Sequence, residues 1–238
     1  MPTDPQKMRL LPLLAWFRSL QKFDRKPIWK ICKICFNARQ EGRTLTQHEK
    51  EENLSMAKYQ TILADPPWDK NQKGRLGAIN HYDLMPLDRI KDMPIADFCE
   101  DNAHLWLWVP NGLIPEGLEV MKSWGFTYRS PFYWIKPRLG LGTYLRNASE
   151  VVLFGTRGKA PVKFKAQPNW VFAPLQDHSH KPEEQYAIIE RVSPGPYLEL
   201  FARRRQPGWD AWGNEIDSDI IIPGYPVPKY SNKVTEGA

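Results

Sequence analysis

The segment Ile62-Leu63-Ala64-Asp65-Pro66-Pro67-Trp68 runs from a short apolar stretch directly into an acidic turn that contains two prolines and a tryptophan. Such an apolar stretch, bounded by turn residues, is typical of a strand buried in a parallel sheet. Ligands of open α/β sheets bind at the carboxyl ends of the strands, which is where Asp65 falls. Because proline fixes φ, we expect the turn to hold the carbonyls of Pro66 and Pro67 in place, without local N–H partners, beside the flat face of Trp68.

Further short apolar runs follow this segment, with helical patterns between them. Strands are predicted over residues 59–64, 104–109, 127–135, 150–154 and 197–202, and helices over residues 115–124 and 182–192. The alternation predicts an α/β fold in which helices cover both faces of a mostly parallel sheet. Residues 139–148 and 157–173 show weak periodicity and are interpreted as connections.

Positive charge is concentrated at the start of the chain. The 238 residues carry a formal charge of +6; residues 1–55 hold 11 Lys and Arg against 6 Asp and Glu, and residues 56–238 hold 22 against 21. We interpret residues 1–55 as a basic extension, either accessory or dispensable, residues 56–222 as one α/β domain, and residues 223–238 as a tail. Binding of nucleic acid must therefore rest on local patches, such as the basic residues between 138 and 165, which also fit a solvated surface.

The cysteines and the hydropathy pattern exclude several classes of protein. Cys32, Cys35 and Cys99 form an odd, sparse set, which argues against a disulfide framework and fits a reducing cytoplasm. Cys32 and Cys35 have the spacing of half a zinc site, but no second pair follows, so no metal is expected. No apolar run approaches the ~20 residues that cross a membrane, so we expect a cytoplasmic protein without a membrane partner.

An acidic side chain beside fixed carbonyls suits the methylation of an exocyclic amine. The N6 lone pair of adenine is delocalised into the ring, so this nitrogen is a poor nucleophile until acceptors hold its hydrogens. Asp65 and the Pro66 carbonyl are candidates for these acceptors, and Trp68 for stacking on the base. A sulfonium methyl donor is already a strong electrophile, so alignment would supply most of the catalysis. Taken alone, the segment is equally compatible with an ordinary turn.

The same segment resembles the Asp-Pro-Pro-Trp hallmark of the MT-A70 adenine N6 methyltransferases. The resemblance extends from Tyr59 to Asn214, with matching stretches at 80–85, 105–109, 134–137, 146–150, 155–158, 178–182, 198–203 and 213–214. It implies a Rossmann-like class I methyltransferase fold with a permuted motif order, in which the catalytic loop precedes the strand that contacts the cofactor. It also implies S-adenosylmethionine as the cofactor.

The resemblance further implies a role for each candidate site residue. Asp65, Pro66, Pro67 and Trp68 match catalytic positions; Lys181, Glu199, Phe201, Arg203, Asn214 and Glu215 match cofactor-binding positions; Tyr82, Lys136, Arg146, Asn147 and Glu150 match substrate-binding positions. These roles are chemically coherent, because a carboxylate such as Glu199 can accept hydrogen bonds from ribose hydroxyls, and Lys181 and Arg203 can pair with the donor's carboxylate.

The leading prediction is therefore an adenine N6 methyltransferase that acts on DNA as a monomer or homodimer, because the chain resembles the compact prokaryotic and phage members of the family, whose expected substrate is DNA. An RNA methyltransferase is the closest alternative. A catalytically silent nucleic-acid-binding subunit and a protein amide methyltransferase fit less well, because the Asp65 to Trp68 signature is intact. Trp106 and Trp108 are interpreted as core residues, and His178 and His180 as neighbours of a helix start rather than metal ligands.

Overall fold

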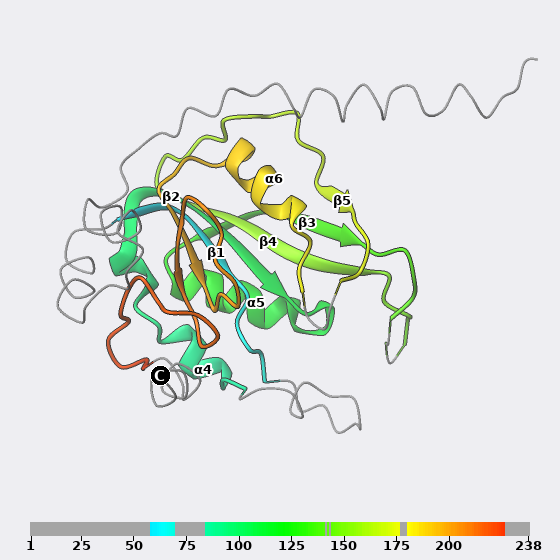
Figure 1. Ribbon diagram of the computed structural model, residues 1–238, viewed down its shortest axis with the longest axis horizontal. Helices are drawn as coiled ribbons and strands as arrows, with labels where there is room; N and C mark the ends of the chain where they lie inside the picture. Colours follow the sequence, from blue (N-terminus) through cyan, green and yellow to red (C-terminus); the bar gives the residue numbers. More distant parts are fainter. Residues whose placement is uncertain (1–57, 70–83, 141, 143, 177–179, 227–238) are drawn as a thin grey trace, which may run out of the picture.

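The computed structural model describes residues 58–69, 84–140, 142, 144–176 and 180–226. Within them the chain forms a seven-stranded sheet with the order β5-β3-β4-β2-β1-β6-β7 (Figure 1). The strands are β1 (Tyr59–Ala64), β2 (Cys99–Val109), β3 (Thr127–Ile135), β4 (Ser149–Arg157), β5 (Trp170–Phe172), β6 (Tyr197–Leu200) and β7 (Trp209–Trp212). Only β4 runs antiparallel to its neighbours in this sheet, so the predicted α/β fold with a mostly parallel sheet is confirmed.

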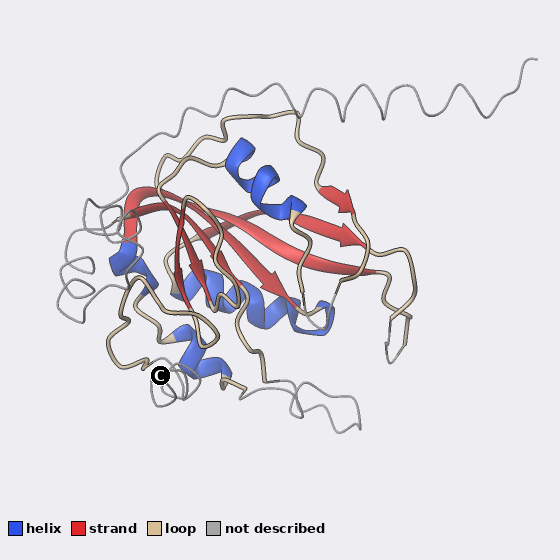
Figure 2. Cartoon of the chain, viewed as in Figure 1, coloured by secondary structure: helices blue, strands red, loops and turns tan. Residues whose placement is uncertain are grey.

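Helices cover both faces of the sheet (Figure 2). On one face lie α4 (Leu87–Lys91) and α5 (Ile114–Ser123), whose buried side chains join a core cluster with the β1, β2 and β4 residues that point to that side. On the other face lies α6 (Glu184–Val192), which buries Ile188, Ile189 and Val192 against a second cluster. Two short 3-10 helices, Ile95–Phe98 and Asn111–Leu113, precede β2 and α5.

The predicted elements differ from the observed ones mainly at their ends. β1 and β3 have the predicted bounds, whereas β2 begins five residues earlier than predicted, at Cys99, because the polar residues 100–102 interrupt its apolar pattern. The short elements α4, β5 and β7 were not predicted. β7 was missed because Asp210 interrupts its apolar pattern; this buried carboxylate accepts a hydrogen bond from Tyr59 Oη at 2.9 Å.

The direction of the strands brings the candidate site residues to one edge of the sheet. β1, β2, β3, β6 and β7 all end at this edge, and the antiparallel β4 begins there. Asp65 follows β1, Lys136 follows β3, and Glu150 is the second residue of β4. Phe201 follows β6 and Gly213 follows β7. Residues that lie far apart in the sequence therefore meet where ligands of α/β sheets bind.

The core extends to Tyr225, three residues beyond the domain boundary expected at 222. The Tyr225 side chain is buried, its hydroxyl donates to the Arg89 carbonyl at 2.8 Å, and the Arg89 guanidinium lies 4.4 Å from the ring centroid. The expected extension 1–55 lies outside the described residues, as does most of the expected tail. No helix in the described part of the chain is long and apolar enough to span a membrane.

Candidate active site

The loop after β1 is held by three backbone hydrogen bonds. Asp65 N donates to the Leu200 carbonyl of the adjacent strand at 3.5 Å, Trp68 N donates to the Pro66 carbonyl at 2.8 Å, and Met85 N donates to the Pro67 carbonyl at 2.8 Å. The expectation that the proline carbonyls have no local N–H partner is therefore wrong for Pro66, because the chain folds back in a three-residue turn, whereas the partner of the Pro67 carbonyl comes from a distant segment. Each carbonyl oxygen keeps a second lone pair that can accept from a ligand.

Trp68 anchors this loop to the neighbouring strand. Its indole N–H donates to the carbonyl of Trp108, at the end of β2, at 2.9 Å, and the side chain is 6% exposed. A tryptophan buried in this way needs a partner for its N–H, which the strand end supplies. The structure thus adds an anchoring role for Trp68, while its stacking on a base stays a prediction.

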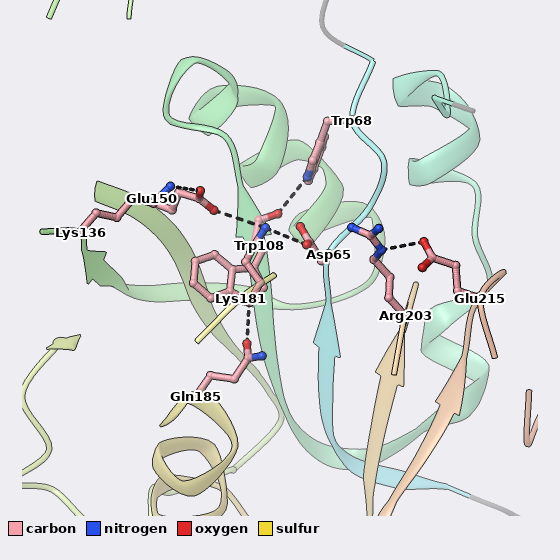
Figure 3. Close-up of polar contacts among 9 residues, drawn as sticks. All are labelled: Asp65, Trp68, Trp108, Lys136, Glu150, Lys181, Gln185, Arg203 and Glu215. Carbon is pink, nitrogen blue, oxygen red and sulfur yellow. Dashed lines mark hydrogen bonds and ion pairs between the residues drawn. The ribbon is translucent and has the colours of Figure 1, made fainter. Parts of the chain in front are cut away.

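A chain of four alternating charges crosses the carboxyl edge of the sheet (Figure 3). Lys181 Nζ lies 2.8 Å from Asp65 Oδ2 and 3.3 Å from Glu150 Oε2, and Lys136 Nζ pairs with Glu150 Oε1. The four side chains come from four separate segments: the loop after β1, the end of β3, the start of β4 and the residues before α6. The structure therefore places the predicted cofactor residue Lys181 directly on the predicted catalytic carboxylate.

Burial and ion pairing have opposite effects on the protonation of these four side chains. Burial raises the pKa of Asp65 above its ordinary value, and the attraction of Lys181 offsets only part of that. Burial has the same effect on Glu150, but Lys181 and Lys136 outweigh it and hold its pKa below the ordinary value. For Lys181 burial disfavours the cation, yet the two carboxylates outweigh it and raise the pKa. Lys181 therefore stays charged between an ionised Glu150 and a more easily protonated Asp65.

Two tryptophans lie beneath the two lysines. Lys181 Nζ is 5.0 Å from the Trp108 ring and Lys136 Nζ is 4.7 Å from the Trp134 ring, distances at which a cation is attracted to an aromatic face. The two indoles meet edge to face, with centroids 6.4 Å apart and planes at 83°. We call Trp108 and Trp134 the aromatic floor.

The predicted cofactor-binding residue Glu199 lies on β6, next to β1. Its Oε2 accepts a hydrogen bond from the Tyr186 hydroxyl at 3.0 Å, and its other carboxylate oxygen makes no hydrogen bond within the described residues. Burial raises the pKa of Glu199 to about 8, against the opposing effect of the Tyr186 hydrogen bond. The negative charge of Asp65, which follows the adjacent strand β1, adds to this rise.

The remaining predicted cofactor residues follow β6 and β7. Phe201 has a φ of 62°, a left-handed conformation that costs energy for a bulky side chain and that clusters at functional sites. Its ring packs edge to face on Trp212 at 5.2 Å. Arg203 Nε donates to Glu215 Oε1 at 2.7 Å. Asn214 immediately precedes Glu215 in the turn that follows β7. These residues thus form a second group beside Asp65 rather than a separate site.

Some predicted substrate residues are not part of either group. The Arg146 guanidinium donates to the Gly140 carbonyl at 2.6 Å, and Asn147 Oδ1 accepts from Asn111 Nδ2 at 3.2 Å, so both stabilise the connection between β3 and β4. Tyr82 lies outside the described residues, as does His178. His180 pairs with Glu183 at 2.6 Å before α6, as expected for a neighbour of a helix start.

Two residues of the site were missed or misjudged from the sequence. Trp108 was interpreted only as core, yet it contacts both the catalytic loop and Lys181. Gln185 accepts a hydrogen bond from the Trp108 indole N–H at 2.9 Å and is 5% exposed. Gln185 could have been noticed in the sequence, because it occupies a position of the helical repeat shared with Ile188, Ile189 and Val192, where only apolar residues are expected.

The fold and the position of the Asp-Pro-Pro-Trp loop at a strand end define the class of protein: a Rossmann-like α/β methyltransferase domain. The expected motif order is present, since the loop follows β1 and the strand that carries Glu199 comes near the end of the chain. The sequence profile of the MT-A70 family matches residues 59–215, and the chain belongs to this family.

Individual relatives agree with this assignment. The chain is 30% identical over 195 residues to the type II methyltransferase M.MunI of a Mycoplasma species, a match that covers 71% of this chain and 83% of that protein. It is 29% identical over 195 residues to the N(6)-adenosine-methyltransferase catalytic subunit METTL3 of Homo sapiens and to the METTL3 subunit of Danio rerio. These two matches cover 76% of this chain but 32% of each relative, so the chain spans about a third of their length.

Proposed function

We propose that this protein transfers the methyl group of S-adenosylmethionine to the N6 amino group of adenine in DNA. The observation that carries the proposal is the Asp65 carboxylate, fixed at the end of β1 by Lys181 at 2.8 Å and placed next to the Pro66 carbonyl. Two acceptors on one rigid turn suit the two hydrogens of an exocyclic amine. Membership of the MT-A70 family supports this assignment.

In the proposed reaction the sulfonium group supplies an electrophilic methyl, and the residues of this chain align and activate the amine. Asp65 and the Pro66 carbonyl accept the N6 hydrogens, which localises the lone pair on nitrogen. The carbon–nitrogen bond forms as the carbon–sulfur bond breaks, and one amine proton leaves toward Asp65, whose pKa burial raises. Lys181 keeps Asp65 in place, and Glu150 keeps Lys181 in place.

The residues present fit the donor. Glu199 offers a carboxylate oxygen to a ribose diol, and Arg203 offers a guanidinium to the amino-acid carboxylate of the donor. Phe201 and Asn214 lie on the same two turns. We propose that these residues, with Glu215 supporting Arg203, hold S-adenosylmethionine beside Asp65.

The raised pKa of Glu199 predicts how donor binding depends on pH. An ionised carboxylate is the stronger acceptor, so donor affinity should increase as the pH rises through about 8, the pKa of Glu199. Fold stability should change in the opposite sense: the contribution of this group is full below its ordinary pKa of 4.5 and is lost as the pH rises through about 8. Calorimetric titration of the donor at several pH values checks the first statement, and chemical unfolding checks the second.

Glu199→Gln is the matched control for this pH dependence, because it keeps the shape of the side chain and removes the titration. At a pH above 8 it should weaken donor binding by about 10- to 100-fold, and its donor affinity should vary less with pH than that of the wild type. An equally steep pH dependence in Glu199→Gln would assign the effect to another group, including the donor's own amine.

DNA is proposed over RNA because the match to M.MunI covers most of that protein, whereas the METTL3 relatives are matched over about a third. Equal amounts of duplex DNA, single-stranded DNA and RNA of one sequence, incubated with a tritiated donor, separate the candidates. We expect the highest kcat/KM on DNA. Transfer to RNA alone would support the N(6)-adenosine-methyltransferase alternative, and donor binding without transfer to any nucleic acid would support a silent binding subunit.

The connection between β3 and β4 is the proposed contact to the nucleic-acid strand. Tyr144 and Leu145 are 97% and 83% exposed there, and the exposed Arg138 and Arg146 flank them. Exposed aromatic rings next to guanidinium groups suit base stacking together with phosphate contacts. Because β3 ends and β4 begins at the catalytic edge, this connection extends from Lys136 and Glu150.

Tyr144→Ala should therefore raise the KM for the nucleic acid by roughly tenfold, with little change in kcat, since a stacked base contributes ~1–3 kcal/mol. Steady-state kinetics with varied oligonucleotide measure both constants. Tyr128→Ala is the control, because Tyr128 is 40% exposed at the opposite end of β3, away from the catalytic edge. Equal effects of the two substitutions on the KM would show that the connection between β3 and β4 does not contact the nucleic acid.

A further inference from the structure

Trp108 is engaged by three different parts of the proposed site (Figure 3). Its carbonyl accepts the Trp68 indole N–H of the catalytic loop at 2.9 Å. Its own indole N–H donates to Gln185 Oε1 of α6 at 2.9 Å, and its ring lies 5.0 Å from Lys181 Nζ. One residue therefore contacts both the loop that carries Asp65 and the lysine that pairs with Asp65.

Lys181 and Gln185 approach Trp108 from one short segment. The Gln185 backbone N–H donates to the Pro182 carbonyl at 3.1 Å, which closes a turn between Lys181 and the start of α6. Gln185 is 5% exposed, and a buried amide is costly unless it is hydrogen-bonded. The bond from the Trp108 indole offsets this cost and fixes the segment 181–185 to β2.

Trp106 shows that packing alone does not require this arrangement. It lies two residues earlier on β2, in the same buried cluster as Trp108, and its indole N–H donates to Ser193 Oγ at 2.9 Å. Ser193 follows α6 at its far end, and the pairing of Trp106 with Phe154 places it in the interior of the sheet. Trp106 therefore matches Trp108 in residue type, in burial and in having a partner for its indole N–H. Unlike the ring of Trp108, its ring makes no cation–π contact with Lys181 or Lys136 within the described residues.

We propose that Trp108, oriented by Gln185, is a positioning residue that sets the geometry of the Asp65–Lys181 pair. This inference rests on the proposed function, since it assigns a role in the same site. Trp108 holds the catalytic loop through its backbone carbonyl and Lys181 through its ring, so one residue contacts both members of the pair, and the contact to Lys181 is the one that depends on the indole. If the indole is lost or turns, Lys181 can withdraw toward Glu150, and Asp65 loses its partner.

The test compares Trp108→Phe and Gln185→Leu with Trp106→Phe. We expect both site variants to lower kcat at least about tenfold while the KM for the donor changes little, because a small misplacement of reacting groups is costly. Trp106→Phe should lose thermal stability to a similar extent but keep kcat. Gln185→Leu retains the indole and decides the comparison if Trp108→Phe does not unfold cooperatively. Equal kcat losses in all three variants would indicate a packing role and overturn the proposal.

A second measurement does not depend on activity. The titration of Asp65 can be followed by carbon-13 NMR, with Asp65→Asn to assign the signal. Loss of the Lys181 contact should raise the pKa of Asp65 in Trp108→Phe and Gln185→Leu above that of the wild type, and leave it unchanged in Trp106→Phe. An unchanged titration in both site variants would contradict the proposal. Absence of methyl transfer by the wild-type protein would instead contradict the proposed function, and the titration would still decide the inference.

Discussion

Replacement of Asp65 by alanine should lower kcat at least about 100-fold and leave donor affinity near the wild-type value. The carboxylate is proposed to accept the amine hydrogen as the carbon–nitrogen bond forms, so its interaction strengthens in the transition state. Glu150 lies 3.3 Å from Lys181 and still pairs with it in the variant, so the substitution leaves no unpaired lysine. The effect therefore reports on chemistry rather than on a collapsed charge network.

Single-turnover rates at saturating donor and nucleic acid measure the chemical step, and calorimetry measures the donor. Asp101→Ala is the control: Asp101 is an exposed carboxylate near the start of β2, at the opposite edge of the sheet. A near-normal single-turnover rate for Asp65→Ala would refute the proposed mechanism. If donor binding is lost together with activity, Asp65 would instead be assigned a role in binding the donor.

Gly213→Ala should destabilise the protein by at least about 3 kcal/mol or prevent folding. An added Cβ would lie 2.0 Å from the Ala202 carbonyl oxygen and 2.7 Å from Ala202 N. Both atoms belong to the backbone of Ala202. The Ala202 N–H donates to the Trp212 carbonyl at 2.9 Å, which holds this backbone against β7, so the clash cannot be relieved by moving a flexible side chain. The turns that carry Arg203 and Asn214 would have to separate, and donor affinity should fall with stability.

Gly112→Ala is the matched control, because a Cβ at Gly112 meets nothing within 4 Å. We expect this control to stay within about 1 kcal/mol of the wild type, since alanine also restricts the unfolded chain. Urea unfolding of the two variants gives the comparison directly. Similar stabilities would show that the two turns can separate without cost.

The fold could be predicted to a large extent because the central strands β1, β2 and β4 have apolar runs that are buried on both faces. β1 and β3 were predicted with the observed bounds, and the edge at which Asp65 lies followed from the rule for α/β sheets. Elements that rely on tertiary contacts were not predicted: β5 has three residues, and β7 contains the buried Asp210, which the Tyr59 hydroxyl satisfies. Local pattern alone cannot show a hydrogen bond between residues so far apart in the sequence.

The site was predicted as a set of residues but not as an arrangement. The assignment of Lys181 to the donor stays a prediction; its pairing with Asp65 and Glu150 was not predicted, because it depends on the end of β1 and the start of β4 meeting at one edge. The Pro66 carbonyl was expected to be unpaired, but a turn within the loop supplies a donor. Trp108 looked like core because it is core; its additional role lies in the direction of its N–H and its ring face, which a sequence does not encode locally.

The neighbouring position of β1 and β6 has a consequence for how the protein is made. Thr61 of β1 pairs with Tyr197 of β6. Most of the domain must therefore be synthesised before β1 can pair with β6, its second neighbour in the sheet. Pairing across such a sequence separation is slow, since a long loop must close first. Until then β1, buried on both faces in the finished protein, offers an unpaired apolar edge on which nascent chains can aggregate. Ribosome-bound chains that end before β6 should therefore need chaperones, and those that extend past β7 should not.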